Sequence, residues 1–115
     1  MTARNLLLSA PPFAVETALA QLGSRLRTAR LRRNLTIAEV GLKIGAGARA
    51  IRDAEHGKPS TTMAVYAALL WAYDLLPDLH GVADLAKDEV GMALAQRDAR
   101  LRAREPRQQD LDNDF

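Results

Sequence analysis

Apolar residues recur at helical spacing near the start of the chain. Val15, Leu19, Leu22, Leu26 and Ala29 follow one another at intervals of four and three residues, as positions on one side of an α-helix do. The spacing predicts a helix over residues 13–33 with one buried stripe. Most of its arginines lie off that stripe, so we expect them on the solvent side.

Two short helices separated by a tight turn are predicted next. Thr36 precedes Glu39 by three residues, which is the capping box that begins a helix. Apolar residues then recur three and four apart until Gly45-Ala46-Gly47 breaks the pattern. A second helix follows, with Ile51 and Ala54 expected to face inward. Two helices joined by a short, glycine-containing turn are typical of a helix-turn-helix.

The segment 61–76 is apolar on nearly every side, with Ser60 as a candidate cap and Pro77 expected to end the helix. Such a helix must be covered on more than one side. Two interpretations stay open: a second subunit covers it, or neighbouring helices of the same chain cover it alone. Its expected core or dimer-interface residues are Met63, Tyr66, Leu70, Trp71 and Tyr73.

The two ends of the chain are predicted to be less regular. Residues 1–12 are expected to form a flexible, irregular arm, in which Leu6-Leu7-Leu8 pairs as a short strand or docks on a neighbour. The main domain is expected over residues 13–78. Residues 79–104 should form a helical extension, with a short helix around 79–85 and a longer one over 88–104 that Gly91 interrupts. Residues 105–115 have the composition of a disordered tail.

Composition narrows the class of protein. The 115 residues are 48% hydrophobic and 26% charged, as in a soluble globular protein of one domain plus tails. Ala, Leu and Arg outnumber Val, Ile and Thr, which favours an all-α fold. The chain has no cysteine, so disulfides are excluded and a reducing compartment is natural. The longest apolar run is 11 residues, too short for a membrane span, so we expect a cytoplasmic protein.

Charge is distributed unevenly along the chain, although the net charge is only +2. Residues 1–35 carry six Arg and one Glu, a balance of +5, whereas residues 77–115 carry six basic and nine acidic residues, a balance of −3. This asymmetry fits a polyanion on one side and another partner on the other. Solvated helix faces would give similar totals, so both interpretations stay open.

Motifs for catalysis or cofactor binding are missing from the sequence. His56 and His80 are far apart and there is no Cys, so we expect no metal site. Ser9, Ser24 and Ser60 stand in no nucleophile motif, and no glycine-rich phosphate loop of standard spacing is present. We therefore expect neither an enzyme nor a cofactor.

A resemblance to a known family rests on three segments: residues 22–30 (LGSRLRTAR), residues 33–40 (RNLTIAEV), and Ile51 with Glu55 and Gly57. On these residues the chain resembles the Cro/repressor helix-turn-helix family, also called the XRE family, over about residues 22–76. The resemblance implies a five-helix, all-α domain that binds double-stranded DNA as a homodimer at an inverted-repeat operator. It also implies that Arg30 pairs with Glu55 as a structural ion pair.

The flanking segments are similar to those of HipB-like antitoxins. They are residues 11–16 (PPFAVE), 57–61 (GKPST), 64–71 (AVYAALLW) and 88–94 (DEVGMAL). In that group a small DNA-binding protein represses its own operon and holds a HipA-type serine/threonine kinase toxin inactive. The resemblance implies the same role and the same partner for this chain.

The chain departs from the family pattern at the helix-turn-helix itself. Ile37 stands where a Gln usually reaches phosphate, and Gly47 replaces the Ser that usually caps the second helix. Gly41 replaces a usual Ala, which costs about 1 kcal/mol of helix propensity. The outward positions include short or acidic side chains, so specificity is expected to be low or to rest partly on DNA shape.

Candidate DNA contacts gather in and around the motif. Arg49 and Arg52 are the best candidates for the major groove, because an Arg can donate two hydrogen bonds to guanine. Phosphate contact and simple solvation stay open for both. Thr36 suits a phosphate at a helix N-terminus, although capping alone explains it. The expected DNA-binding set is Arg32, Arg33, Thr36, Ala48, Arg49, Arg52, Asp53 and Lys58.

Two other functions stay open besides the antitoxin. The first is a protein-interaction module with a degenerate helix-turn-helix, which would bind the kinase through the acidic C-terminal third. The second is a free-standing repressor of phage or metabolic type, with no toxin beside it.

Overall fold

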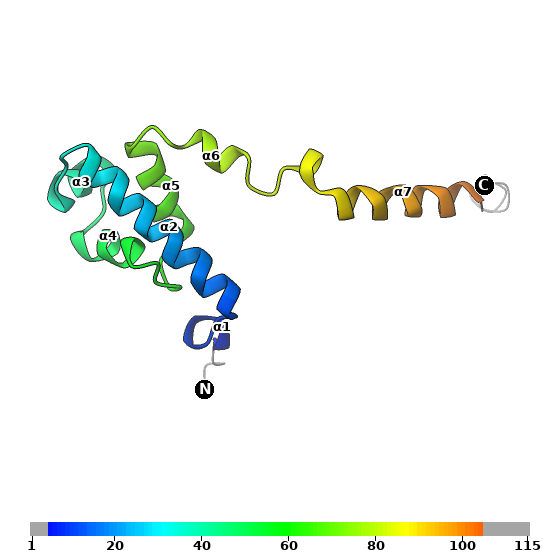
Figure 1. Ribbon diagram of the computed structural model, residues 1–115, viewed down its shortest axis with the longest axis horizontal. Coiled ribbons are helices and arrows are strands. Elements are labelled where there is room, and N and C mark those ends of the chain that lie inside the picture. Colours follow the sequence, from blue (N-terminus) through cyan, green and yellow to red (C-terminus); the bar gives the residue numbers. More distant parts are fainter. Residues whose placement is uncertain (1–4, 105–115) are drawn as a thin grey trace, which may run out of the picture. The chain divides into compact units, whose positions relative to one another are not determined.

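The computed structural model describes residues 5–104, and within this range every regular element is a helix (Figure 1). This confirms the expected all-α class. The elements are α1 (Leu6–Ser9), α2 (Phe13–Arg32), α3 (Ile37–Ile44), α4 (Ala48–Glu55), α5 (Met63–Ala72), α6 (Pro77–His80), the 3-10 helix η1 (Leu85–Lys87) and α7 (Glu89–Arg104). The predicted tail of residues 105–115 lies outside the described residues.

The chain divides into two compact units, the first ending at Leu79 and the second beginning at His80. In the first unit α2 packs against α4, while α3 packs against both α4 and α5. One core joins these helices, and its members are Leu26, Ala29, Val40, Ile51, Ala54, Tyr66, Leu69, Leu70, Ala72 and Tyr73. Burying one large apolar side chain of this kind stabilises a fold by about 1.5–3 kcal/mol.

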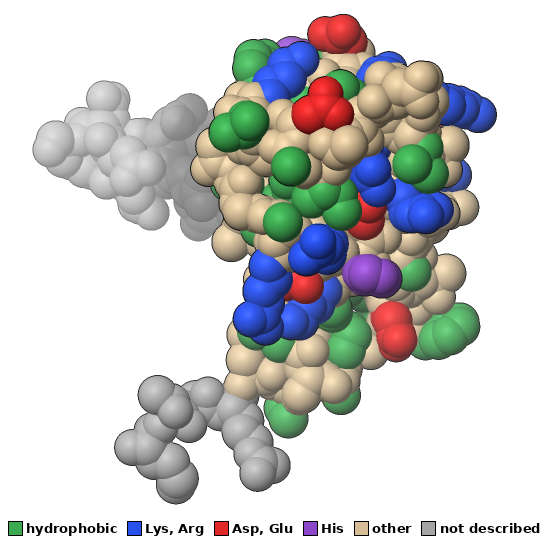
Figure 2. Space-filling view, turned by 90° about the vertical axis from the view of Figure 1, so that its left-hand side faces the viewer, with side chains coloured by type: hydrophobic (Ala, Val, Ile, Leu, Met, Phe, Trp, Pro, Cys, Tyr) green, Lys and Arg blue, Asp and Glu red, His purple; other side chains and the backbone are tan. Residues whose placement is uncertain are grey.

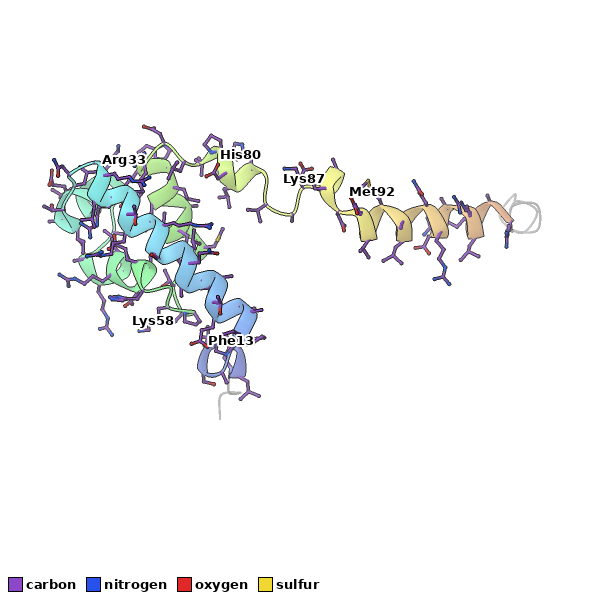
Figure 3. The ribbon with its side chains drawn as sticks, viewed as in Figure 1. Phe13, Arg33, Lys58, His80, Lys87 and Met92 are labelled. Carbon is purple, nitrogen blue, oxygen red and sulfur yellow. The ribbon has the colours of Figure 1, made fainter. Side chains whose placement is uncertain are left out.

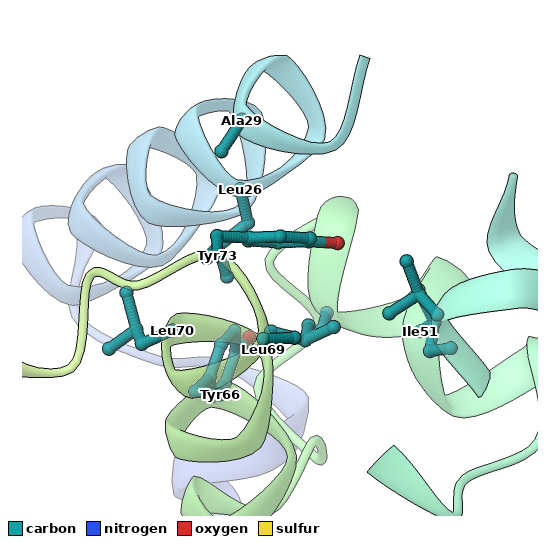
Figure 4. Packing of buried hydrophobic residues seen from close by; sticks show 10 residues of the cluster. Leu26, Ala29, Ile51, Tyr66, Leu69, Leu70 and Tyr73 are labelled. Atoms are coloured by element: carbon teal, nitrogen blue, oxygen red, sulfur yellow. The ribbon is translucent and has the colours of Figure 1, made fainter. Parts of the chain in front are cut away.

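The Tyr73 ring occupies the middle of this core. Figure 4 shows the ring lying between Leu26 of α2 and Leu69 of α5. All three side chains are fully buried. Since Tyr73 follows the last residue of α5, the end of that helix is held against α2 by a large aromatic contact.

Two glycines let the backbone of α2 lie directly on the end of α4. A Cβ at Gly23 would lie 2.5 Å from the carbonyl oxygen of Ala54, and a Cβ at Gly57 would lie 2.4 Å from that of Leu19. Gly57 also has a φ of +68°, a conformation that L side chains rarely adopt. The register between α2 and α4 is therefore set by backbone contact as well as by side chains.

The predicted apolar stripe on α2 is buried only in its second half. Leu26 and Ala29 are buried, Leu19 and Leu22 are half-buried, and Val15 is exposed. The reason is visible in Figure 1, where the N-terminal turns of α2 extend beyond α4 and α5. The stripe prediction was wrong for the first turns of the helix, because Val15 is left exposed by the described residues of the first unit.

The helix predicted over residues 61–76 is shorter than expected. It ends at Ala72, and Asp74 then adopts a left-handed conformation with φ +59°. The amide of Leu75 donates to the Leu70 carbonyl oxygen at 2.7 Å, which closes the helix end. Pro77 begins α6 instead of ending α5, a position that suits its missing N–H. Ser60 is not the cap, because Thr62 occupies that position.

The apolar helix α5 is covered on part of its surface only. Tyr66, Leu70 and Tyr73 are buried in the core, whereas 55% of Met63 and 52% of Trp71 is exposed. Within the first unit, the neighbouring helices therefore leave Met63 and Trp71 uncovered, and both interpretations of this helix stay open. Their faces stay available to a partner.

Local structure at the N-terminal end differs from the irregular arm that was expected. Leu6–Ser9 form the single helical turn α1, in which the Ala10 amide donates to the Leu6 carbonyl oxygen at 2.8 Å. The leucines of this segment therefore form no strand. Pro11 and Pro12 follow and separate α1 from α2, because proline cannot continue the hydrogen-bond pattern.

The second unit contains η1 and α7, and none of its described residues is buried. The short helix predicted around 79–85 is replaced by α6, which begins two residues earlier, and by η1. Gly91 does not interrupt α7, so that prediction was wrong. It lies in the first turn, where its amide donates to the Asp88 carboxylate at 2.9 Å. Asp88 thus caps the helix through Gly91.

Candidate nucleic-acid interface

The first helix of the motif, α3, begins with a complete capping box. The Glu39 amide donates to the Thr36 hydroxyl at 3.1 Å, and the Thr36 amide donates to the Glu39 carboxylate at 3.1 Å. The hydrogen bonds from Thr36, its backbone amide first, lower the pKa of the Glu39 carboxyl. These contacts fix the start of α3, where free amides and the helix dipole favour an anion.

The turn between α3 and α4 depends on two glycines. Gly45 ends α3 in the left-handed conformation with φ +74°, and the Gly45 and Ala46 amides both donate to the Gly41 carbonyl oxygen, at 2.8 and 3.1 Å. A Cβ at Gly41 would lie 2.7 Å from the backbone oxygen of Ala46. Gly41 therefore permits the tight return of the chain, which offsets its low helix propensity.

The second helix of the motif, α4, separates inward and outward residues. Ile51, Ala54 and Glu55 are buried, while Ala48, Arg49 and Arg52 are exposed. Gly47 occupies the N-cap position without any side-chain hydrogen bond, and a Cβ there would meet open space. The inward face supplies the packing, so the outward face is available for contacts outside the chain.

Arg30 and Glu55, which the family resemblance pairs, make a two-point contact between α2 and α4. Arg30 Nε donates to Glu55 Oε2 at 2.7 Å and Nη2 donates to Oε1 at 3.1 Å. Nη1 also donates to the Leu35 carbonyl oxygen at 2.9 Å. Both residues are buried, and the bond to Glu55 raises the pKa of Arg30. This fork geometry is the strong form of an ion pair, and it holds α4 in place.

Arg49 and Arg52 carry free charge on the outward face of α4. Within residues 5–104 neither guanidinium makes a hydrogen bond or a salt bridge. Figure 2 shows this side of the molecule, where Lys and Arg side chains form several groups with Asp and Glu side chains among them. Next to Arg52, the His56 ring Nδ1 lies 2.8 Å from the Arg52 carbonyl oxygen and so carries the proton that it donates.

Asp53 and Lys58 partly neutralise one another at the far end of α4. Lys58 Nζ lies 3.8 Å from Asp53 Oδ2, and the Lys58 amide donates to the Asp53 carbonyl oxygen at 2.9 Å. The two side chains are 48% and 31% exposed, so the long ion pair is weak. A phosphate group could replace Asp53 as the partner of Lys58 at small cost.

The side chains of Arg33 and Arg32 lie away from α4. The Arg33 guanidinium donates to the carbonyl oxygens of Ala29 at 2.9 Å and Tyr73 at 2.8 Å, and its Cζ lies 5.6 Å from the centroid of the Tyr73 ring. Figure 3 labels Arg33 and Lys58 at opposite ends of the first unit. Arg32 lines a surface hollow of about 350 Å³ beside Arg25, so it faces away from the Arg30 side of α2.

Sequence reasoning missed a second cation at the end of α5. Lys43 Nζ donates to the Ala72 carbonyl oxygen at 3.2 Å and lies 5.6 Å from the centroid of the Trp71 ring. Cations suit the last carbonyls of a helix because the dipole is negative there. The apolar spacing of α3 leaves Lys43 off the core face, but nothing in the pattern indicates that α5 ends beside it.

Comparison with known proteins identifies the class. A protein-family model described as a helix-turn-helix domain matches residues 21–81, more than half of the chain. The chain therefore belongs to this helix-turn-helix family. No curated protein and no solved structure matched the chain.

The family match and the geometry agree on the general function. The matched range contains α3, the turn and α4, and the domain is that of DNA-binding regulators of XRE-like type. Domains of this family are typically not enzymes. Among the described residues, no helix has the length and apolar character needed to cross a membrane.

Proposed function

We propose that the protein is a cytoplasmic, dimeric repressor that binds a specific operator through α4. The observation that supports this most is the pair Arg49 and Arg52, exposed and without partners in the described chain on a helix that Arg30 and Glu55 hold in place. One turn apart on the same face, the two guanidinium groups suit guanine O6 and N7 in the major groove.

The remaining contacts of this proposal position the protein on the DNA backbone. The capped N-terminus of α3, with Thr36, offers amides and a hydroxyl to one phosphate. Lys58, after α4, reaches another when it leaves Asp53. The proposal assigns no DNA contact to Arg32 or Arg33, because Arg33 donates to two carbonyl oxygens of the fold and Arg32 lies beside Arg25 on α2.

Dimerisation is part of the proposal because one α4 alone covers too short a site. The exposed side chains of Met63 and Trp71 on α5 supply an apolar surface that a second copy would cover. A two-fold dimer places its two recognition helices about 34–36 Å apart, in successive major grooves. The operator is then an inverted repeat.

The antitoxin role rests on the resemblance of the flanking segments to HipB-like proteins. In this proposal the dimer represses its own operon and holds a HipA-type serine/threonine kinase inactive. Co-purification with the product of the neighbouring gene tests it. Capture of a kinase whose activity falls on binding supports the role, and a neighbouring gene that encodes no kinase leaves a free-standing repressor.

A gel-shift titration with DNA from upstream of the gene, at two salt concentrations, tests DNA binding. For the natural protein, the logarithm of the affinity should fall by about 0.9 per phosphate contact for each tenfold rise in salt. Replacing Arg49 and Arg52 by Ala should abolish the specific shift. Arg25 and Arg32 provide the matched control, because their replacement removes the same charge from the far side of α2. Equal loss in both variants would contradict base reading by α4.

A second candidate function is a protein-interaction module with a degenerate motif. Ile37 favours it, because this half-buried side chain packs against the core where the family usually offers an amide to phosphate. The same titration separates the two functions. Salt-labile binding without sequence preference, or none, together with an intact dimer, would favour the interaction module.

A further inference from the structure

Helix α7 has an apolar face that nothing in its own unit covers. None of the residues from His80 to Arg104 is buried, and six large apolar side chains in this range are at least 43% exposed. They are Val82, Leu85, Val90, Met92, Leu94 and Leu101. Helices in proteins gain most of their stability from packing of an amphipathic face, so the 16-residue α7 is expected to pack against something else.

Three of these residues form one stripe along α7. Val90, Leu94 and Leu101 are four and seven residues apart, which places them within about 40° of one another around a helix that turns 100° per residue. Position 97, between Leu94 and Leu101, lies on the same side of the helix, and the aliphatic stem of an arginine is itself apolar. The stripe therefore runs along most of α7 and suits pairing with another helix.

Charge changes sign along α7. Asp88 and Glu89 stand at its start, whereas its last two turns carry Arg100, Arg102 and Arg104 together with a single carboxylate, Asp98. The same distribution suits the dipole of each helix. In a parallel pair of copies, acidic ends would lie beside acidic ends and basic beside basic. In an antiparallel pair, each acidic end lies beside a basic one.

We infer that α7 pairs antiparallel with α7 of a second copy of this chain. With Val90 across from Leu101 of the other copy, Glu89 and Asp88 fall beside Arg102 and Arg104 of that copy. An antiparallel pair of identical helices is itself two-fold symmetric, so it is compatible with a two-fold dimer. The inference rests on the proposed dimer and adds a second contact to it.

Cysteine cross-linking of the full chain tests the pairing, because the natural sequence has no cysteine. Val90→Cys and Leu101→Cys proteins, tagged to differ in size, are mixed and oxidised. The antiparallel register brings the two positions within the roughly 7 Å between Cα atoms that a disulfide needs, so the mixed 90–101 dimer should exceed both self-linked dimers about tenfold. Dominant 90–90 and 101–101 products would overturn the orientation.

Ala99→Cys, mixed with Val90→Cys, is the matched control, because position 99 lies about 180° around the helix from Val90. A mixed 90–99 yield equal to the 90–101 yield would overturn the inference. Sedimentation of the same proteins under reducing conditions keeps the two proposals apart. If the protein is a dimer but the 90–101 disulfide does not form, only the α7 pairing is contradicted. If the protein is a monomer, the proposed dimer is contradicted as well.

A pair of charge variants gives a second, independent measurement. Leu94→Glu places a charge in the stripe, whereas Gln96→Glu places the same charge about 140° from Leu101 around the helix. The first should weaken dimerisation at least about tenfold, which is about 1.4 kcal/mol, and the second should leave it unchanged. Equal dimer affinity in both variants would contradict the inference.

Discussion

Two groups of arginine in the first unit have opposite surroundings. At the end of α2, Arg30 forks onto Glu55 and Arg33 holds two carbonyl oxygens. On α4, Arg49 and Arg52 have no such partner within residues 5–104. The residue type is the same, and only the partners differ. Arginine at the end of α2 thus stabilises the fold, while arginine on α4 has the exposed charge, unpaired in the described part of the chain, that the proposed DNA contact needs.

The largest expected effect is the loss of Glu55. Glu55→Ala leaves the buried Arg30 guanidinium without its partner, which should lower the free energy of unfolding by about 3–5 kcal/mol. Urea denaturation followed by circular dichroism measures it. Arg49→Ala, as the control, should change stability by less than about 0.5 kcal/mol. Similar losses in the two variants would remove the distinction between the two groups.

The backbone contact between α2 and α4 gives the next effect. Gly57→Ala adds a Cβ 2.4 Å from the Leu19 carbonyl oxygen and places alanine at a φ of +68°. We therefore expect the free energy of unfolding to fall by about 3 kcal/mol or more. Gly45→Ala has the same kind of φ but meets open space, and should cost about 1–2 kcal/mol. Thermal unfolding of the Gly57→Ala and Gly45→Ala proteins measures the two losses of stability. Equal costs would mean that conformation alone, without close approach, accounts for Gly57.

Arg33 and Arg32 provide a comparison between neighbours. Arg33→Ala removes two hydrogen bonds to carbonyl oxygens and a contact with the Tyr73 ring, which should cost about 1–2 kcal/mol. Arg32→Ala should cost less than about 0.5 kcal/mol. The midpoints of urea denaturation of the two variants measure this difference. A larger loss of stability for Arg32→Ala than for Arg33→Ala would contradict the structural role given to Arg33.

The contribution of the Tyr73 hydroxyl to the free energy of unfolding depends on pH and is smallest near neutral pH. Burial, with a further contribution from the Glu55 carboxylate, raises the pKa of Tyr73 from 10.0 to about 12. The unfolded chain therefore loses this proton first, and the free energy of unfolding should fall as pH rises from about 10 towards 12. Tyr73→Phe should flatten that fall, as measured by urea denaturation at several pH values.

At neutral pH the same substitution should be nearly neutral or slightly stabilising. The Tyr73 hydroxyl is buried and has no hydrogen-bond partner among the described residues, so its removal leaves no group unsatisfied. A large loss of stability at neutral pH would show that the hydroxyl has a partner.

Much of the helix-turn-helix follows from sequence because its signals are local. Thr36 and Glu39 lie three residues apart and cap the helix that they begin, and Gly45 ends it. Apolar spacing likewise places Ile51 and Ala54 in the core. Contacts within one turn of helix are encoded by neighbours in the chain, so they are readable without a three-dimensional structure.

The features that sequence reasoning missed depend on distant contacts. The exposure of Val15 and Trp71 follows from where other helices stop, and the bonds of Arg33 to Tyr73 join residues 40 apart. From sequence, Gly41 only lowers helix propensity. The structure shows that the Ala46 carbonyl oxygen lies where a Cβ at this position would be. For the candidate site, apolar spacing separated the two faces of α4, but not the free arginines from the engaged ones.

The position of Trp71 has a practical consequence for spectroscopy. It is the only tryptophan in the chain, it is half exposed on α5, and the ammonium group of Lys43 lies over its ring. Indole emission shifts to shorter wavelength when water is removed from around the ring. The natural protein therefore carries its own fluorescent reporter, placed on the surface where a second copy is proposed to dock.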